Sequence, residues 1–112
     1  MRLEFHGAAK VNMGANTWAA QTGCFTGNPA HPGAAGTINL NLDPDYLIDD
    51  LECVVKIQVR GAMVASALTA FGYTRPSDAQ IQVTCAQEQP GGAASILADV
   101  DFDISLWRIV PN

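Results

Sequence analysis

The chain has 112 residues, which fits a single domain with one hydrophobic core. Hydrophobic residues make up 48% of it, so it can bury a core, whereas charged residues reach only 15%, well below the usual quarter. The net charge is −5 with six lysines and arginines in total, which argues against binding to nucleic acid or to an anionic membrane surface. So few charges also indicate a surface made of small and uncharged polar residues, or one that another molecule covers.

No segment has the length of a membrane-spanning helix, because the longest nearly apolar run, residues 61–72, is too short. The N-terminus carries charges at Arg2 and Glu4 and lacks the apolar core of a secretory signal peptide. We therefore expect a protein that is made and folded in a cytoplasm and is not secreted by a signal peptide.

Residues 1–36 differ in composition from the rest of the chain. They hold six of the ten glycines, and no Asp, Glu, Lys or Arg occurs between Lys10 and Asp43. Only residues 2–6 alternate between apolar and polar side chains, as in a short edge strand. The composition is that of a flexible tail, but a neutral segment with large apolar side chains needs cover. We therefore predict an extended arm over residues 1–36 that lies across a neighbouring subunit, with these interface residues: Phe5, Met13, Trp18 and Phe25.

The remainder, residues 37–112, is predicted to be an all-β domain. Apolar and polar side chains alternate in four segments, which is the pattern of antiparallel strands with one buried and one solvated face. Strands of this length separated by turns indicate an antiparallel β-sandwich, of which a jelly roll is one form. Residues 62–72 fit a helix and a strand almost equally well, and this segment stays open. The predicted strands cover residues 37–43, 51–60, 80–86 and 96–106, with turns at 43–45 and 89–92.

The outer faces of two predicted strands carry opposite charges. Strand 51–60 has Lys56 and Arg60 on its outer face. Adjacent antiparallel strands would interleave these cations with the aspartates of strand 96–106, and each pair would contribute roughly 0.2–1 kcal/mol. We therefore predict that the two strands are neighbours in one sheet. The aspartates concerned are Asp99, Asp101 and Asp103.

The alternation of the last strand conflicts with the residues that follow it. If it continued unchanged, it would place Arg108 on the core side and Trp107 with Ile109 on the outer side. A β-bulge near residue 106 would remove this conflict and turn Trp107 and Ile109 into the core. Alternatively, these two residues form an exposed apolar edge that serves as an interface anchor. Trp107 and Ile109 are accordingly the second set of predicted interface residues.

Signals for a catalytic or metal site are weak. The acidic residues of segment 43–52 do not follow the calcium-loop pattern, and the aspartates of segment 99–103 fit the solvated side of a sheet better than a pair of catalytic carboxylates. Cys24 and His31 could form a nucleophilic or metal-binding pair, but both lie in the glycine-rich segment. We therefore predict no enzymatic activity, no metal and no cofactor. The other two cysteines are predicted to be buried thiols on the apolar faces of strands: Cys53 and Cys85.

A compact β domain that follows an uncharged, extended arm resembles, in its organisation, the decoration (cement) proteins and related minor virion proteins of tailed bacteriophages. No sequence motif carries this resemblance, so no residue role transfers from it. The resemblance implies a structural subunit of the virion that bridges copies of the capsid protein or of itself. Its contacts would be strand addition and burial of apolar side chains, and we expect it to form a homo-oligomer.

Two other functions stay open. A small binding module for carbohydrate or another small ligand would need an exposed aromatic platform, and a cupin-like enzyme would need more clustered histidines than the two present. The arm separates these classes, because a virion subunit needs it for assembly and not for folding. A binding module or an enzyme would pack it into its own fold or do without it. We predict that deletion of residues 1–36 leaves a folded domain that no longer assembles.

Overall fold

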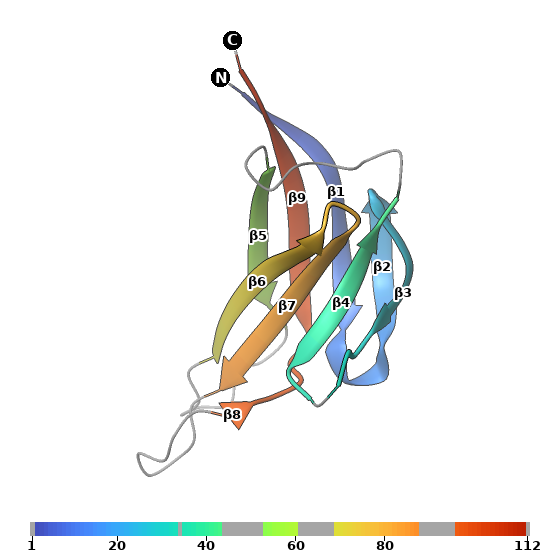
Figure 1. Ribbon diagram of the computed structural model, residues 1–112, viewed down its shortest axis with the longest axis vertical. Helices are drawn as coiled ribbons and strands as arrows, with labels where there is room; N and C mark the ends of the chain where they lie inside the picture. Colours follow the sequence, from blue (N-terminus) through green and yellow to red (C-terminus); the bar gives the residue numbers. More distant parts are fainter. Residues whose placement is uncertain (1, 34, 44–52, 61–68, 88–95, 112) are drawn as a thin grey trace.

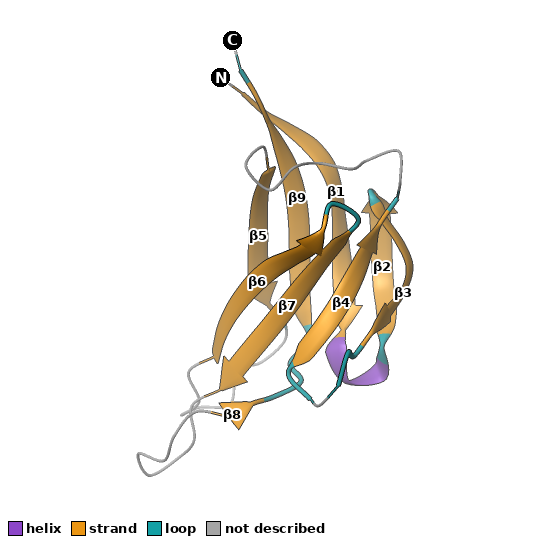
Figure 2. Cartoon of the chain, in the orientation of Figure 1, coloured by secondary structure: helices purple, strands orange, loops and turns teal. Residues whose placement is uncertain are grey.

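The computed structural model describes residues 2–33, 35–43, 53–60, 69–87 and 96–111. In these residues the structure is almost entirely strand, with one short 3₁₀ helix at Met13–Ala15 and no α-helix (Figure 2). The same residues contain no helix of the length and apolarity that crossing a membrane requires. The strands form two antiparallel sheets that pack against each other (Figure 1). The predicted all-β antiparallel sandwich is confirmed.

The first sheet, sheet A, has the strand order β2-β1-β9-β5, and every neighbouring pair in it is antiparallel. The first and last strands of the chain lie side by side at its centre, so both ends of the chain emerge at the same end of the sandwich (Figure 1). Its strands are β1 (Arg2–Asn12), β2 (Thr17–Gly23), β5 (Cys53–Val59) and β9 (Phe102–Val110).

The second sheet, sheet B, has the strand order β3-β4-β7-β6, and the short strand β8 pairs with the end of β7. Consecutive strands pair within one sheet at β1–β2, β3–β4, β6–β7 and β7–β8. The order therefore differs from that of a jelly roll, in which consecutive strands mostly lie in opposite sheets. The strands of sheet B are β3 (Phe25–Ala30), β4 (Thr37–Leu42), β6 (Thr69–Ser77), β7 (Gln80–Gln87) and β8 (Ile96–Leu97).

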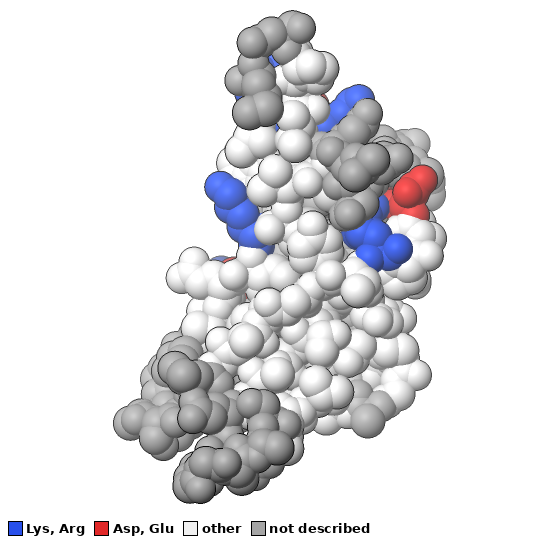
Figure 3. Space-filling view, turned by 60° about the vertical axis from the view of Figure 1, so that its left-hand side comes forward, with Lys and Arg blue, Asp and Glu red and all other residues white. Residues whose placement is uncertain are grey.

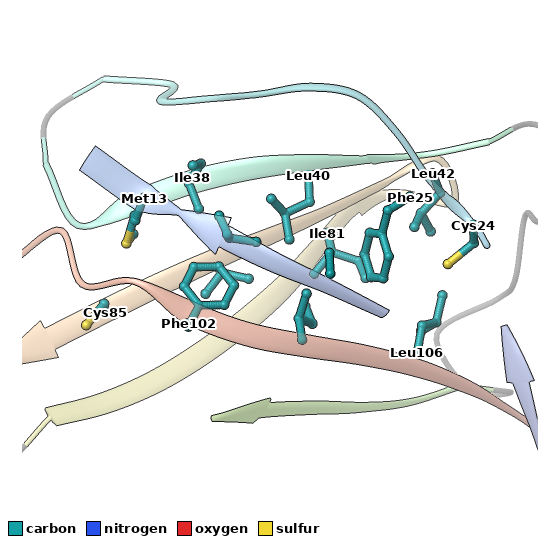
Figure 4. Packing of buried hydrophobic residues seen from close by; sticks show 14 of the residues in the cluster. Met13, Cys24, Phe25, Ile38, Leu40, Leu42, Ile81, Cys85, Phe102 and Leu106 are labelled. Atoms are coloured by element: carbon teal, nitrogen blue, oxygen red, sulfur yellow. The ribbon is translucent and has the colours of Figure 1, made fainter. Parts of the chain in front are cut away.

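Apolar side chains from both sheets fill the space between them (Figure 4). Every second residue of β4, of β7 up to Cys85 and of β9 up to Leu106 is buried in this core, as the alternation predicts. Phe71 of β6 packs against Phe102 of β9, with ring centroids 5.4 Å apart. Burial of one such side chain contributes about 1.5–3 kcal/mol, so this core is the main force that holds the sheets together. Its most deeply buried members include Val11, Met13, Ile38, Leu40, Ile81, Val83, Phe102, Ile104 and Leu106.

The prediction of a separate N-terminal arm is wrong. β1, β2 and β3 all lie within the predicted arm, and β1 pairs with β9 from Arg2 to Val11. Met13 and Phe25 are buried in the core, with exposed fractions of 0% and 3%. Trp18 packs against Phe25, with ring centroids 5.7 Å apart. The boundary predicted at residue 36 would therefore divide a single core, and the predicted folding of the chain without residues 1–36 is not compatible with this structure.

Two glycines let the chain leave sheet A and continue in sheet B. Gly7 of β1 lies opposite Gly23 at the end of β2, and Gly23 has a φ of +69°. A Cβ atom on Gly23 would lie 2.2 Å from the carbonyl oxygen of His6. That oxygen accepts a 2.8 Å hydrogen bond from the backbone N–H of Cys24, the residue that crosses between the sheets. The corner has no room for a side chain. Glycines in residues 1–36, a segment with the composition of a flexible tail, are therefore required at this corner of the fold.

The strands predicted beyond residue 36 are present with one change. β4, β5 and β7 match three of the predicted strands within the described residues. The predicted strand 96–106 is two strands instead, because the chain crosses from β8 in sheet B to β9 in sheet A at residues 98–101. Ile96 and Leu97 are consequently exposed, with fractions of 49% and 52%. Residues 69–72 of the open segment are strand, whereas residues 44–52, 62–68 and 89–92, which carried other predictions, lie outside the described residues.

The predicted neighbourhood of the two oppositely charged strands is confirmed, because β5 pairs with β9 along its length. One of the expected charge pairs forms, between Arg60 Nη2 and Asp101 Oδ2 at 3.4 Å. The carboxylate of Asp103 is instead paired with Lys10 of β1, at 3.2 Å. The ammonium group of Lys56 lies 5.2 Å from the centroid of the Trp107 ring.

Candidate functional site

The chain-terminal ends of β1 and β9 extend past the rest of the sandwich as a two-stranded ribbon (Figure 1). We define this β1–β9 ribbon as residues 2–5 and 107–110. Trp107 and Arg108 also pair with Val54 and Cys53 of β5, so only the outermost residues are two-stranded. The pairing between β1 and β2 begins only at Gly7, and within the described residues no strand lies beside residues 2–5 on that side. Isolated two-stranded ribbons are at most marginally stable in water, so this end of sheet A has the least support.

The outer face of the β1–β9 ribbon is apolar. Leu3 and Phe5 are 42% and 50% exposed, and they pair with Ile109 and Trp107 on β9. Side chains of directly opposed residues share one face of a sheet. The rings of Phe5 and Trp107 meet nearly edge to face, with centroids 5.1 Å apart and an interplanar angle of 66°. These four side chains form one apolar cluster, which we call the apolar end.

Trp107 lies on the outer face of sheet A, not in the core. The register of β9 against β5 is regular through residues 102–108, so the predicted bulge near residue 106 is absent. The irregularity lies instead in the neighbouring strand, between Phe5 and Gly7. Trp107 Nε1 donates a 3.0 Å hydrogen bond to Ser105 Oγ on the same outer face. Arg108 keeps the core-facing phase, opposite the buried Cys53 of β5, and is nevertheless exposed.

The structure divides the predicted interface residues into two groups. Phe5, Trp107 and Ile109 come together at the apolar end, although they were predicted from two separate patterns. The core or its margin contains the other three, which are therefore not an accessible arm surface: Met13, Trp18 and Phe25. Leu3 belongs to the apolar end and was not singled out, although its alternation with Phe5 in residues 2–6 was the available signal.

The opposite face of the β1–β9 ribbon is charged, because it carries Arg2, Glu4 and Arg108. The Arg2 guanidinium lies 3.8 Å from the Glu4 carboxylate, and the other oxygen of Glu4 is 3.1 Å from His6 Nε2. Figure 3 shows a face of the molecule on which the charged side chains of the described residues are few and gather in its upper half. The low charge of the sequence thus leaves wide areas of uncharged surface.

A hollow of about 550 Å³ lies on the outer face of sheet A. Small side chains line part of it, namely those of Ala8, Ala20 and Ser105, and no aromatic ring lines it. Ser105 also accepts the hydrogen bond from Trp107, so the hollow adjoins the apolar end along β9. The rest of the lining consists of the apolar residues Ala9, Ile57 and Ile104 and of polar and charged residues: Lys10, Gln21, Thr22, Lys56, Gln58 and Asp103. Such a lining could hold a polar small molecule through hydrogen bonds.

A polar cluster closes the opposite end of the sandwich. His31 Nε2 lies 2.7 Å from Asp99 Oδ1, and His31 Nδ1 contacts the side-chain oxygen of Asn16. The backbone N–H of Gly36 donates a 2.8 Å hydrogen bond to the same Asp99 oxygen. Burial by itself would raise the pKa of Asp99, but the hydrogen bonds from Gly36 and His31 and the charge of His31 lower this pKa overall. The cluster thereby ties together the loops that carry these four residues.

The Cys–His pair that the sequence suggested does not form. Cys24 and His31 lie at opposite ends of β3. Burial raises the pKa of the Cys24 thiol to about 11, and burial together with the nearby Asp99 charge does the same for Cys85. Thiols with such pKa values are protonated at neutral pH and are poor nucleophiles. Cys53 and Cys85 are buried, as predicted. The described residues contain no group of three or more His, Cys, Asp or Glu side chains placed to hold a metal ion.

No protein-family model, curated protein or solved structure matches this chain. Functional inference therefore starts from its own residues. Of the three regions above, the polar cluster is satisfied within the fold, whereas the apolar end and the hollow are open to another molecule.

Proposed function

We propose that this chain is a structural subunit of a larger protein assembly and that it contacts a neighbouring subunit through the apolar end. The observation that carries this proposal is the exposure of Leu3 and Phe5, at 42% and 50%, beside Trp107 on a protruding ribbon. Contiguous apolar surface of this kind marks interaction sites, and aromatic anchors dominate binding energy at many interfaces. Each Å² of apolar surface that a partner covers would contribute about 25 cal/mol, from which the entropic cost of association is subtracted.

The low charge of the protein supports the same proposal. Only 15% of its residues are charged, so wide areas of its surface can be covered without desolvation of charges. Arg2 and Glu4 at the rim already lie close to each other. Interface cores are depleted of charged residues, whereas charged groups such as Arg2, Glu4 and Arg108 are accommodated at the polar rim of an interface.

A capsid decoration (cement) subunit of a bacteriophage virion is the most specific form of the proposal. Its resemblance to that family depended on an extended arm, and the corresponding residues are folded into both sheets. The apolar end and the low charge are what supports it now. Residues 1–36 packed into the fold are equally what was expected of a small binding module, so that alternative gains support from the same observation.

Co-sedimentation tests the assembly proposal. The experiment uses the full chain without a terminal tag, because both ends of the chain belong to the ribbon. Expressed at its native level in the cells that produce it, this protein should sediment with a large particle. Phe5→Ser should move most of it to the fractions of the isolated protein. Ile96→Ser is the matched control, because Ile96 is equally exposed at the far side of the fold, and this variant should sediment like the wild type. Wild-type protein that stays with small species, or a Phe5→Ser variant that sediments unchanged, would refute the proposal.

The hollow on sheet A favours the second candidate, a binding module for a saccharide or a similar polar small molecule. Its lining combines small side chains with amide, hydroxyl and charged groups. Titration with soluble oligosaccharides, followed by the fluorescence of the adjoining Trp107, would test this candidate. Saturable binding that is lost in Ala20→Trp, a variant that fills the hollow, would support it. The absence of any fluorescence response up to millimolar ligand would reject the binding module and leave assembly as the one remaining proposal.

A further inference from the structure

The edge of β1 at residues 2–5 is open in the described structure. On one side these residues pair with residues 107–110 of β9, and on the other side the ladder with β2 begins only at Gly7. The last contact on that side is the hydrogen bond from Cys24 N–H to the carbonyl oxygen of His6. A strand edge with unpaired backbone groups is a template for another strand. All four residues of this edge are exposed.

We infer that this edge pairs with the same edge of a second copy of the chain, antiparallel, about a twofold axis beside Leu3. The inference rests on the proposed function and names the neighbouring subunit. Sheet A would thereby continue into sheet A of the partner through two adjacent β1 strands. A twofold contact uses the same surface on both copies, so that surface must complement itself.

The charges of the edge select this register. With the axis beside Leu3, Arg2 of each copy lies directly opposite Glu4 of the other, which gives two attractive cross-strand pairs. An axis at Glu4 would instead place two carboxylates opposite each other. Glu4 also lies opposite Arg108 on β9, so in the preferred register positive and negative groups alternate across the joined strands.

The apolar residues of the edge agree with the same register. Leu3, 42% exposed, would face its own copy at the axis, and Phe5 would lie next to it on the same face. The apolar ends of both copies would then form one continuous surface across the joint. β2 pairs with β1 only from Gly7 onward, so it does not obstruct a partner strand beside residues 2–5.

The contact is small, and we expect a weak dimer with a dissociation constant on the order of 0.1 mM in the isolated protein. In a large assembly many such contacts would act together, and a weak joint between two copies would suffice.

A charge swap measured by sedimentation equilibrium tests the inference on the purified full chain. Arg2→Glu and Glu4→Arg each replace two attractive pairs with two repulsive ones, and each should weaken the dimer about tenfold. The double variant, Arg2→Glu with Glu4→Arg, restores opposite charges at both pairs between the copies and should dimerise more tightly than either single variant. A protein that is monomeric up to millimolar concentration, or a double variant as weak as the single ones, would overturn the inference.

A cross-link tests the register independently of affinity. In the Leu3→Cys variant the two new thiols would face each other across the axis, within reach of a disulfide, and mild oxidation should give a covalent dimer. Ile109→Cys is the control. Both β1 strands would lie between the two β9 strands, so the two thiols at position 109 would be about 14 Å apart and should not form a disulfide. The three native cysteines are buried and contribute little background. No cross-link in Leu3→Cys, or equal cross-linking in both variants, would contradict the register.

The outcomes also separate this inference from the proposed function. Wild-type protein that sediments with large particles but stays monomeric when purified would refute self-pairing and leave the assembly role standing, with a different neighbour. A purified protein that dimerises through residues 2–5 but never joins a large particle would refute the assembly role and leave the dimer.

Discussion

The ring of Phe5 packs nearly edge to face against the ring of Trp107, with 5.1 Å between their centroids. The two residues come from opposite ends of the chain and meet because β1 and β9 are neighbours in sheet A. Phe5 remains 50% exposed in this contact. The pair thus stabilises the ribbon while it keeps apolar surface available to a partner, and this combination is what distinguishes the apolar end from the core.

Substitution of Phe5 should separate these two roles. Phe5→Ser removes one aromatic pair and some buried surface, and we expect the free energy of unfolding to fall by about 1–2 kcal/mol. Phe102→Ala in the core should lower it by about 3–5 kcal/mol, since Phe102 is fully buried. Urea denaturation of both variants measures the difference. Equal losses would mean that Phe5 is a core residue and would remove the argument for an interface.

Deletion of residues 1–36 should unfold the protein, because it removes three strands and the core residues Val11, Met13 and Phe25. Met13→Ala gives the same test without a truncation. It should lower the free energy of unfolding by about 2–5 kcal/mol, whereas Ile96→Ala at an exposed site should cost less than about 1 kcal/mol. Near-ultraviolet circular dichroism of the deletion and urea titration of the two variants measure these effects. If the variant without residues 1–36 still unfolded cooperatively, the prediction of a separate arm would hold after all.

The corner between β2 and β3 allows a matched pair of glycine substitutions. Gly23 and Gly27 have nearly equal φ angles of +69° and +66°, but only a Cβ on Gly23 would strike backbone atoms, 2.2 Å from the oxygen of His6. Gly27→Ala should cost about 1 kcal/mol for the left-handed conformation alone, and Gly23→Ala about 3 kcal/mol or more. Thermal and urea unfolding give both values. Similar costs at the two sites would show that the corner is looser than the structure indicates.

The polar cluster around Asp99 predicts a particular dependence of stability on pH. The pKa of Asp99 is lower in the folded protein than its ordinary value. Its contribution to stability is therefore complete above the unfolded pKa, about 3.9, and is lost as the pH falls through the folded value. The free energy of unfolding of the wild type should drop more steeply below about pH 4 than that of Asp99→Asn. Parallel curves for the two proteins, measured by urea unfolding at successive pH values, would contradict the assigned hydrogen bonds.

The alternation of apolar and polar residues was enough to predict β4, β5 and β7, because one face of each is buried and the other is polar. It indicated only residues 2–6 of β1 and missed the rest of β1 and β2, where alanine and glycine occupy both faces and conceal the period. β2 also buries very little, so its sequence carries almost no signal of its place at the edge of sheet A. The position of β2 is set by its pairing with β1, and that of β1 by its pairing with β9, more than by the local sequence pattern of either strand.

The division of residues 96–106 into two strands was hidden for a different reason. The aspartates at 99 and 101 continue the apparent alternation across the crossing between the sheets, but each of them also binds specific partners. Asp99 binds His31 and Gly36, and Asp101 binds Arg60 and the backbone N–H of Met13. Likewise, Phe5 and Trp107 were each predicted as interface residues, but their contact depends on the pairing of β1 with β9, which no local pattern encodes.

The most direct test of the apolar end as the assembly surface is amide hydrogen exchange, measured by mass spectrometry on the chain within its assembled particle and on the isolated chain. We predict that residues 2–5 and 107–110 become strongly protected in the particle, while β3 and β6, the edges of sheet B, exchange at the same rate in both states. Protection confined to the edges of sheet B, with residues 2–5 exchanging equally fast in both states, would contradict the proposed role of the apolar end.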